Sequence, residues 1–188
     1  DILKNFTDDS AQLTWGNEVH KALAEAIGPV SAPLPATMAA YQKWVVDCKA
    51  TPGTQYVEQK YALGKDFTVQ PYFGPQVWYR GICDWLCINE AYAKARDWKT
   101  GKIKHDSTQL MLMAACLFVH YPELQTIDTE FVWLQEGVET KDTWTRDGIR
   151  TELIRLIPEV DAMEAASKAF NFPPKPGGLC YKYCPVQS

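Results

Sequence analysis

The alternation of apolar and polar residues between Tyr79 and Lys104 predicts two short strands around a turn. Successive side chains of a strand point to opposite faces, so every second residue shares a face. On the first strand this face would carry Ile82, Asp84, Leu86 and Ile88, and on the second strand, over 93–100, it would carry Ala93, Ala95, Asp97 and Lys99. The turn between the two strands is expected at 89–92.

The register of this hairpin would bring two carboxylates together. If Asn89 pairs with Tyr92, Asp84 lies directly opposite Asp97, with Lys99 two residues further on. Directly opposed side chains have Cβ atoms about 5 Å apart, and opposed like charges are unfavourable. A divalent cation would relieve that repulsion, because Mg²⁺ takes one or two carboxylates and leaves its other positions to water and phosphate. A slip of one residue would instead turn Asp97 to the other face.

Helical and strand periodicities also predict the elements around the hairpin. Helices are expected over 10–27, 36–50, 108–120 and 146–170, and strands over 54–63, 126–134 and 138–145. The helix over 108–120 is apolar on almost every side, which favours burial against the sheet. Pro158 predicts a break or a new start in the last helix. Gly16 costs the first helix about 1 kcal/mol relative to Ala and indicates close packing there.

This order of elements predicts a single domain of the α/β class with a central mixed sheet flanked by helices, α+β being the alternative. We expect N-terminal helices over 1–50, a core over 54–145, and a C-terminal helix with a tail rich in Pro, Gly and Cys over 146–188. On the strand over 54–63, Tyr56, Glu58 and Lys60 would share one face. That face is either part of a site or the solvated side of an edge strand.

Charge is distributed unevenly along the chain. The 188 residues carry a net charge of −4, which excludes a globally basic nucleic-acid coat. The hairpin region departs from this average, with Arg80, Lys94, Arg96, Lys99, Lys102 and Lys104 set against Asp84, Glu90 and Asp97. A basic patch around an acidic pair suits a polyanion held over a metal ion. Alternatively, Lys94, Lys102 and Lys104 are solvated turn residues.

The stretch just before the hairpin is rich in aromatic residues. Its rings could either stack on bases or pack in the core; they belong to Phe67, Tyr72, Phe73, Trp78 and Tyr79.

The cysteines, and the lack of a signal peptide or membrane span, indicate the cellular compartment of the protein. Of the six cysteines, Cys83, Cys87 and Cys116 lie in stretches typical of small buried hydrophobes. No signal peptide opens the chain, and no apolar run reaches the ~20 residues of a membrane span. These features predict a reduced, cytoplasmic setting and no membrane partner.

Four short motifs, taken in order, resemble those of the PD-(D/E)XK nuclease superfamily. They are Gly16-Asn-Glu-Val-His20, Gly81-Ile-Cys-Asp84, Asp97-Trp-Lys99-Thr-Gly-Lys102 and Gln109 at the start of the next helix. Within that superfamily they are similar to the RecB-like branch, which includes phage exonucleases and CRISPR adaptation nucleases. The tail, with Gly178-Leu-Cys180 and Cys184-Pro-Val, also looks like the end of such a domain.

The resemblance implies a restriction-endonuclease-like core and a role for each matching residue. Asp84, Asp97 and the Trp98 carbonyl would bind Mg²⁺ or Mn²⁺, with His20 as an extra ligand and Glu58 as the upstream acid. Lys99 would orient the attacking water and stabilise charge on the phosphate. Gln109 would support the site and contact DNA, together with Arg80, Lys102 and Lys104. For His20, a purely structural role is the alternative.

Two departures from the family pattern stand out. Met113 occupies the place of the tyrosine in the family's QxxxY motif. Some RecB-like nucleases also hold an iron–sulfur cluster, which needs four thiolates. The tail supplies only Cys180 and Cys184, and Cys48 and Cys116 are the remaining candidates. We therefore do not expect a cluster; packing of the tail or a disulfide is favoured.

Together these observations predict a Mg²⁺- or Mn²⁺-dependent deoxyribonuclease acting on duplex ends or single strands in recombination, replication or repair. An exonuclease is favoured over a structure- or sequence-selective endonuclease. The short chain without a helicase is compatible with a phage origin, in which case the setting would be a bacterial host cytoplasm. The rival from another class is a non-catalytic nucleic-acid-binding module, and a plain α/β domain with surface charges is a third interpretation. A second copy of the chain, or a phage or host recombination or replication protein, is a candidate partner.

Overall fold

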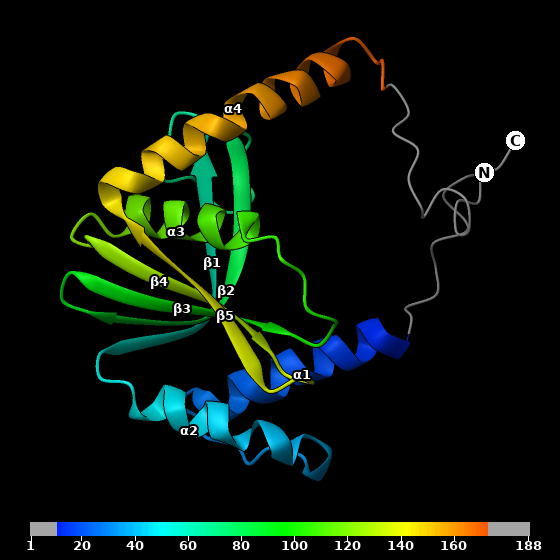
Figure 1. The fold of residues 1–188 in the computed structure, drawn as a ribbon, viewed down its shortest axis with the longest axis vertical. Helices are drawn as coiled ribbons and strands as arrows, with labels where there is room; N and C mark the ends of the chain where they lie inside the picture. The colour runs from blue at the N-terminus through cyan, green and yellow to red at the C-terminus, as the bar shows by residue number, and fades with distance from the viewer. Residues whose placement is uncertain (1–10, 173–188) are drawn as a thin grey trace, which may run out of the picture.

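One mixed β-sheet organises the described part of the chain, residues 11–172 of the computed structural model (Figure 1). Its strands are β1 (Thr54–Gly64), β2 (Val77–Asn89), β3 (Tyr92–Lys99), β4 (Thr126–Trp133) and β5 (Val138–Thr145). They lie side by side in chain order. All neighbours are antiparallel except β3 and β4, which are parallel and are joined through a helix. The predicted mixed sheet is confirmed.

Helices cover both faces of this sheet (Figure 1). On one face lie α1 (Ala11–Ile27) and α2 (Gln42–Ala50), preceded by the 3₁₀ helix η2 (Ala36–Tyr41). On the other face lies α3 (Thr108–His120), with α4 (Arg146–Lys168) packed on α3 and β5. Separate apolar cores fill the two sides, one under α3 and one under α1 and α2. The result is a single α/β domain of three layers.

The predicted hairpin register is confirmed over the residues that pair between β2 and β3. Asn89 pairs with Tyr92, and the pairing continues to Trp85 opposite Arg96. Helix α3 has the predicted bounds and is buried against the sheet. The predicted second helix is instead divided into η2 and α2. The predicted break at Pro158 is wrong, because α4 continues through it.

Side-chain alternation reverses in the middle of both β1 and β2. On β2, Leu86 packs in the core under α3 and Trp85 in the core under α1, yet Cys83 again lies under α3. On β1, Tyr56 contacts the core under α3, and so do Tyr61 and Leu63, five and seven residues later. An even-numbered residue and odd-numbered residues therefore share a face, which a regular strand forbids.

The reversal is centred on Glu58 and Asp84. Val57 pairs with Trp85 and Gln59 with Cys83, so Glu58 lies opposite Asp84. The backbone of Glu58 is left-handed, with φ of 53°, a conformation that a non-glycine residue adopts only under local constraint. Four predicted face assignments are consequently wrong: Ile82 and Asp84 do not share a face with Leu86, and Glu58 and Lys60 do not share one with Tyr56. Irregular strand positions of this kind re-aim side chains and are common beside functional sites.

The length and apolarity of the helices show whether any of them could span a membrane. Between residues 11 and 172, no helix combines the length and apolarity needed to cross a bilayer.

Candidate metal centre and its cleft

An open cleft of about 770 Å³ lies between α1 and the sheet, over the middle of β1 and β2 and the end of β3. One face of α1 lines it, with residues spaced three or four apart. The lining includes Gly16, Asn17, His20, Lys21, Glu58, Ile82, Asp84, Asp97, Trp98 and Lys99. The cleft therefore brings together residues from three of the four sequence motifs.

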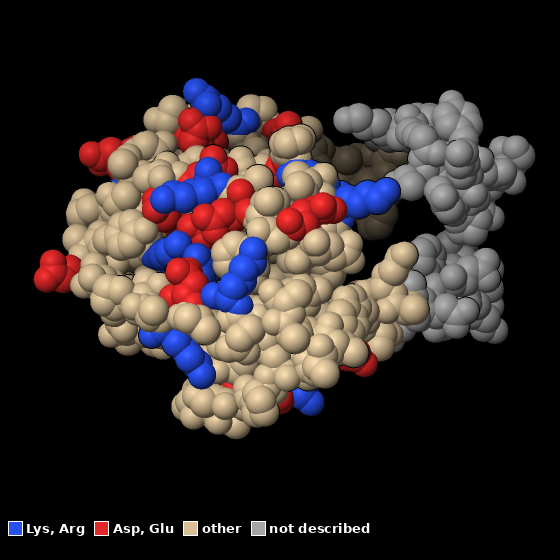
Figure 2. All heavy atoms as spheres, turned by 60° about the horizontal axis from the view of Figure 1, so that its bottom comes forward, with Lys and Arg blue, Asp and Glu red and all other residues tan. Residues whose placement is uncertain are grey.

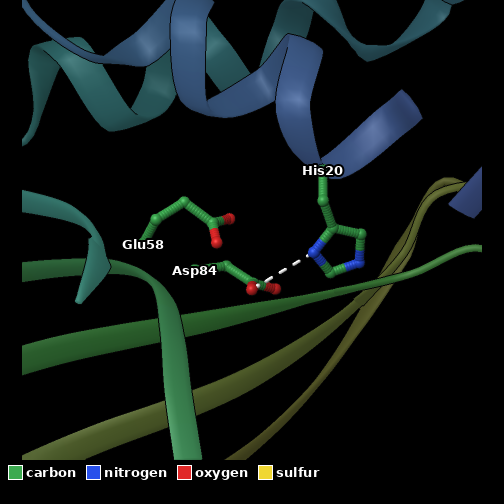
Figure 3. Close-up of side chains that lie close together, drawn as sticks. All are labelled: His20, Glu58 and Asp84. Carbon is green, nitrogen blue, oxygen red and sulfur yellow. Dashed lines mark ion pairs between the residues drawn. The ribbon is translucent and has the colours of Figure 1, made fainter. Parts of the chain in front are cut away.

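Three side chains in this cleft could hold a metal ion together (Figure 3). His20 comes from α1, Glu58 from β1 and Asp84 from β2, and one potential ligand atom of each lies within 4.8 Å of the others. His20 Nδ1 lies 3.2 Å from Asp84 Oδ1. In Figure 3 the Glu58 carboxylate points toward this pair. The reversal at Glu58 and Asp84 turns both carboxylates toward α1, which makes the cluster a product of the strand irregularity.

Asp84 is held in place by the backbone of the neighbouring strand. Its side chain is only 6 % exposed, and Oδ2 accepts a hydrogen bond of 2.7 Å from the Trp98 N–H. The Trp98 indole is buried in the core under α1, so the donor is fixed as well. A hydrogen bond from a backbone N–H to a carboxylate is short and strong, so it fixes the orientation of that carboxylate. Asp84 thus offers its other oxygen to the cleft and to His20.

Asp97, Lys99 and Gln109 form the second half of the site. Asp97 Oδ2 lies 2.6 Å from Lys99 Nζ, and Asp97 Oδ1 accepts a hydrogen bond of 2.6 Å from Gln109 Nε2. Lys99 in turn donates to Gln109 Oε1 at 2.9 Å. Asp97, predicted as a metal ligand, therefore lies outside the group of three formed by His20, Glu58 and Asp84. It lines the same cleft, with both oxygens engaged by α3 and by its own strand.

The charge of Asp84 contributes to a raised pKa of three neighbouring groups of the site. Burial, together with the negative charge of Asp84, raises the pKa of Asp97 to about 6, although Lys99 opposes the shift. Burial and the charge of Asp84 likewise raise the pKa of Glu58. The hydrogen bond to Asp84 raises the pKa of His20, against the effect of burial. Such concentrated negative charge favours a cation, and shifts of this kind gather at functional sites.

The predicted basic residues divide between two places. Lys102 and Lys104 line a groove of about 290 Å³ that continues from Lys99 past Gln109 to Phe131 and Trp133. Arg80 lies elsewhere on β2, with its guanidinium over the rings of Tyr72 and Phe73. Figure 2 shows that the face seen there interleaves basic and acidic side chains, so it does not present one continuous basic surface.

Met113 and the cysteines of the described residues are buried. Met113 lies in the core under α3, where its methyl group would be 3.1 Å from a Cβ added at Gly81. Cys48, Cys83, Cys87 and Cys116 are free buried thiols, in agreement with the sequence-based interpretation of the last three. Burial raises the pKa of Cys48 to about 11. The tail cysteines Cys180 and Cys184 lie outside the described residues.

Sequence reasoning gives no separate role to two sets of polar residues: Asn17 is included only within a motif, and Arg96, counted in the predicted basic patch, is instead buried. Asn17 and Lys21 extend the cleft wall on α1, and their spacing from His20 is the helical signal that could have identified them. Arg96 and Glu130 form a buried ion pair between β3 and β4, with Arg96 Nε donating to Glu130 Oε2 at 2.7 Å. Nothing in the local pattern of β4 distinguishes Glu130 from a solvated strand residue.

Comparison with known proteins adds no family. No protein-family model matches the chain, and a search of curated proteins finds no match. The functional interpretation therefore rests on the residues of the cleft and on the order of their motifs.

Proposed function

We propose that this protein is a metal-dependent deoxyribonuclease with a restriction-endonuclease-like core, which hydrolyses phosphodiester bonds at DNA ends. One observation carries the proposal. A His–Glu–Asp cluster able to hold a divalent cation, built from α1, β1 and β2, shares a cleft with an Asp–Lys pair on β3. A binding module has no need of a lysine placed beside such a cluster.

The donor atoms of the cluster fit a first-row divalent cation. Two carboxylates and one imidazole nitrogen make a mixed oxygen and nitrogen set. Mg²⁺ prefers oxygen ligands, whereas imidazole suits transition metals, so His20 favours Mn²⁺ over Mg²⁺. When bound, such an ion supplies a water of lowered pKa and offsets charge on the phosphoryl oxygens.

Lys99 is the residue best placed to act on the phosphate. Its amine lies between Asp97 and Gln109 and is partly exposed to the cleft. A cation fixed where negative charge develops stabilises the transition state, because little reorganisation is then needed. Gln109 bridges Lys99 and Asp97, so it keeps the amine oriented. Lys102 and Lys104, in the adjoining groove, would bind the phosphates of the strand that extends beyond the scissile bond.

The direct test compares nuclease activity on end-labelled linear duplex, single-stranded and circular DNA with Mg²⁺, with Mn²⁺ and with EDTA. We expect cleavage of linear substrates that EDTA stops and that Mn²⁺ supports at least as well as Mg²⁺. Asp84→Asn keeps an oxygen for the Trp98 N–H, and Lys99→Met keeps the length of the side chain. Lys99→Met should reduce kcat by roughly 10²-fold or more, the cost of removing one transition-state donor, and Asp84→Asn should reduce activity by weakening metal binding.

Matched controls lie on α4, far along the chain from the site. Asp147→Asn and Lys168→Met change the same residue types at exposed positions and should leave activity unchanged. Titration calorimetry with Mn²⁺ should show weaker binding for Asp84→Asn and for His20→Ala than for the wild type. Wild-type activity of Lys99→Met, or metal binding that survives Asp84→Asn unchanged, would refute the assignment. If circular DNA is nicked or linearised, the protein is an endonuclease and the proposed exonuclease mode is wrong.

A further inference from the structure

The loop between β1 and β2 carries two aromatic rings, and the two strands that it joins each place a cation beside them to form one cluster. The Phe73 side chain is 78 % exposed, and its ring meets that of Tyr72 edge to face at 4.9 Å. The Arg80 guanidinium lies 5.2 Å from the Phe73 ring centre and 5.5 Å from that of Tyr72, and Lys60 Nζ lies 5.5 Å from Tyr72. An exposed ring with cations beside it is what a stacked base and its phosphate require.

The two cations of this cluster keep their charge free for an anion. Over residues 11–172, neither Arg80 nor Lys60 forms an ion pair with a carboxylate; Arg80 donates only to the Tyr72 carbonyl, at 3.5 Å. Elsewhere on the sheet, cations are neutralised, as Lys94 is by Glu130 and Lys141 by Asp128. Two unpaired cations over aromatic rings therefore set this loop apart from the mixed charges around it.

The cluster lies on the same face of the β1–β2 hairpin as the metal centre. Tyr79 packs under α3, and a Cβ at Gly81 would contact Met113 of α3. Arg80, between them, and Ile82, next after Gly81, therefore point to the opposite face. Ile82 lines the cleft. Because Ile82 pairs with Lys60, these positions form a row that leads from Asp84 to Arg80.

The length of this row suits a few nucleotides. The strand advances by four residues from Arg80 to Asp84, which is about 13 Å at the usual rise of ~3.3 Å per residue. That distance corresponds to at most about four nucleotides at the ~3.4 Å rise per nucleotide of a duplex strand.

The loop is held in place before any ligand binds. Lys65 pairs with Asp161 and Glu164 of α4, and the Phe67 and Trp78 rings meet edge to face at 6.2 Å. Phe67 and Trp78 line a small pocket with α4, which removes them from the set of stacking candidates. A preformed loop loses less conformational freedom on binding, and this favours affinity.

We propose that Phe73, Tyr72, Arg80 and Lys60 form a single-strand DNA platform. A base stacks on Phe73, its phosphates contact Arg80 and Lys60, and the strand then runs past Ile82 to the metal centre. The inference rests on the proposed action on DNA and adds to it the path by which the strand enters. It makes Phe73 a positioning residue, because the ring lies outside the cleft where cleavage takes place.

The test measures binding without cleavage. Fluorescence anisotropy with a labelled oligothymidine in EDTA should give a Kd that rises about 5-fold or more for Phe73→Ala, the loss expected for one stacked base. Phe73→Trp should retain affinity. Arg80→Ala should lower the slope of log Kd against log salt by about 0.7, the contribution of one single-strand phosphate. Phe170→Ala and Arg155→Ala, exposed on or just after α4, are the matched controls and should bind as the wild type does.

A base analogue reports the contact directly. With 2-aminopurine in the oligonucleotide, wild-type binding should quench its fluorescence, and Phe73→Ala should not. If Phe73→Ala binds as tightly as the wild type, the platform is wrong, and the nuclease proposal is unaffected if metal-dependent cleavage persists. If the wild type binds DNA through Phe73 but cleaves none, the platform stands and the nuclease proposal fails. No binding and no cleavage by the wild type would overturn both.

Discussion

The buried ion pair between β3 and β4 offers a prediction whose size follows from the structure. Arg96 is 3 % exposed and Glu130 is 1 % exposed, and they meet at 2.7 Å. Arg96 also contacts the half-exposed Asp47 at 2.6 Å, and Glu130 also contacts Lys94 at 2.9 Å. The pair links the two parallel strands, one of which carries Asp97 and Lys99 to the cleft.

Removing one partner leaves a buried charge without its main counter-charge. Such a change usually lowers the free energy of unfolding by about 3–5 kcal/mol. Because Lys94 remains beside Glu130 when Arg96 is lost, we expect Arg96→Met to cost about 3 kcal/mol, the lower end of this range. For a domain of this size that lowers Tm by roughly 6–12 °C. The pair with the exposed Asp47 adds at most about 1 kcal/mol.

Replacing both partners should be far less costly than the sum of the two single changes. The double variant Arg96→Met, Glu130→Met buries two apolar side chains and no charge, and such replacements of buried ion pairs are often neutral or stabilising. We expect a coupling energy of about 2–3 kcal/mol, near the upper end for residues in contact.

Urea unfolding measures these differences. Tryptophan fluorescence is a suitable probe, because Trp44 and Trp85 flank the Arg96 guanidinium, with ring centres at 5.5 and 5.2 Å. Arg155→Met, an arginine that is 69 % exposed, is the control and should stay within about 0.5 kcal/mol of the wild type. A cost below about 1 kcal/mol for Arg96→Met, or single costs that add in the double variant, would refute the reasoning.

Two further predictions concern helix α1 and the sheet. Gly16→Ala should stabilise the protein by about 0.5–1 kcal/mol in the same unfolding assay, since a Cβ at this position meets only Thr100 Oγ1, at 3.4 Å, and Ala is the better helix former; a destabilised variant would mean that the helix cannot accept the added methyl group. The pKa of Asp128 is lowered because its hydrogen bonds, the first from Lys141, outweigh the effect of burial. Since the folded pKa lies below the unfolded one, this stabilisation is complete above the unfolded pKa and is lost as the pH falls below about 4. Asp128→Asn should therefore flatten the acid limb of the stability–pH profile, and an unchanged limb would contradict it.

Local patterns in the sequence determined most of the secondary structure. The bounds of α3 follow from an apolar run with polar residues at its start, and the hairpin register follows from the spacing of apolar residues about the 89–92 turn. These features depend on neighbours within a few residues, because hydrophobic periodicity and the residues of the turn decide which helix or hairpin forms. The mixed sheet follows from the order of elements in the same way.

The tertiary structure decided how the site is assembled. The sequence placed Asp84 opposite Asp97, but the irregularity at Glu58 turns Asp84 toward His20 of α1, while Asp97 is held by Lys99 and Gln109. A strand's period assumes unbroken alternation, and a single left-handed residue reverses it for every position that follows.

Contacts between distant segments likewise decided which charged side chains are buried and which aromatic rings are exposed. Glu130 is buried because Arg96, on another strand, neutralises it, and Phe73 is exposed while Trp78 is covered by α4. No local window contains these partners. The sequence alone therefore indicated the candidate residues of the site and their order, and packing between distant elements decided which of them meet.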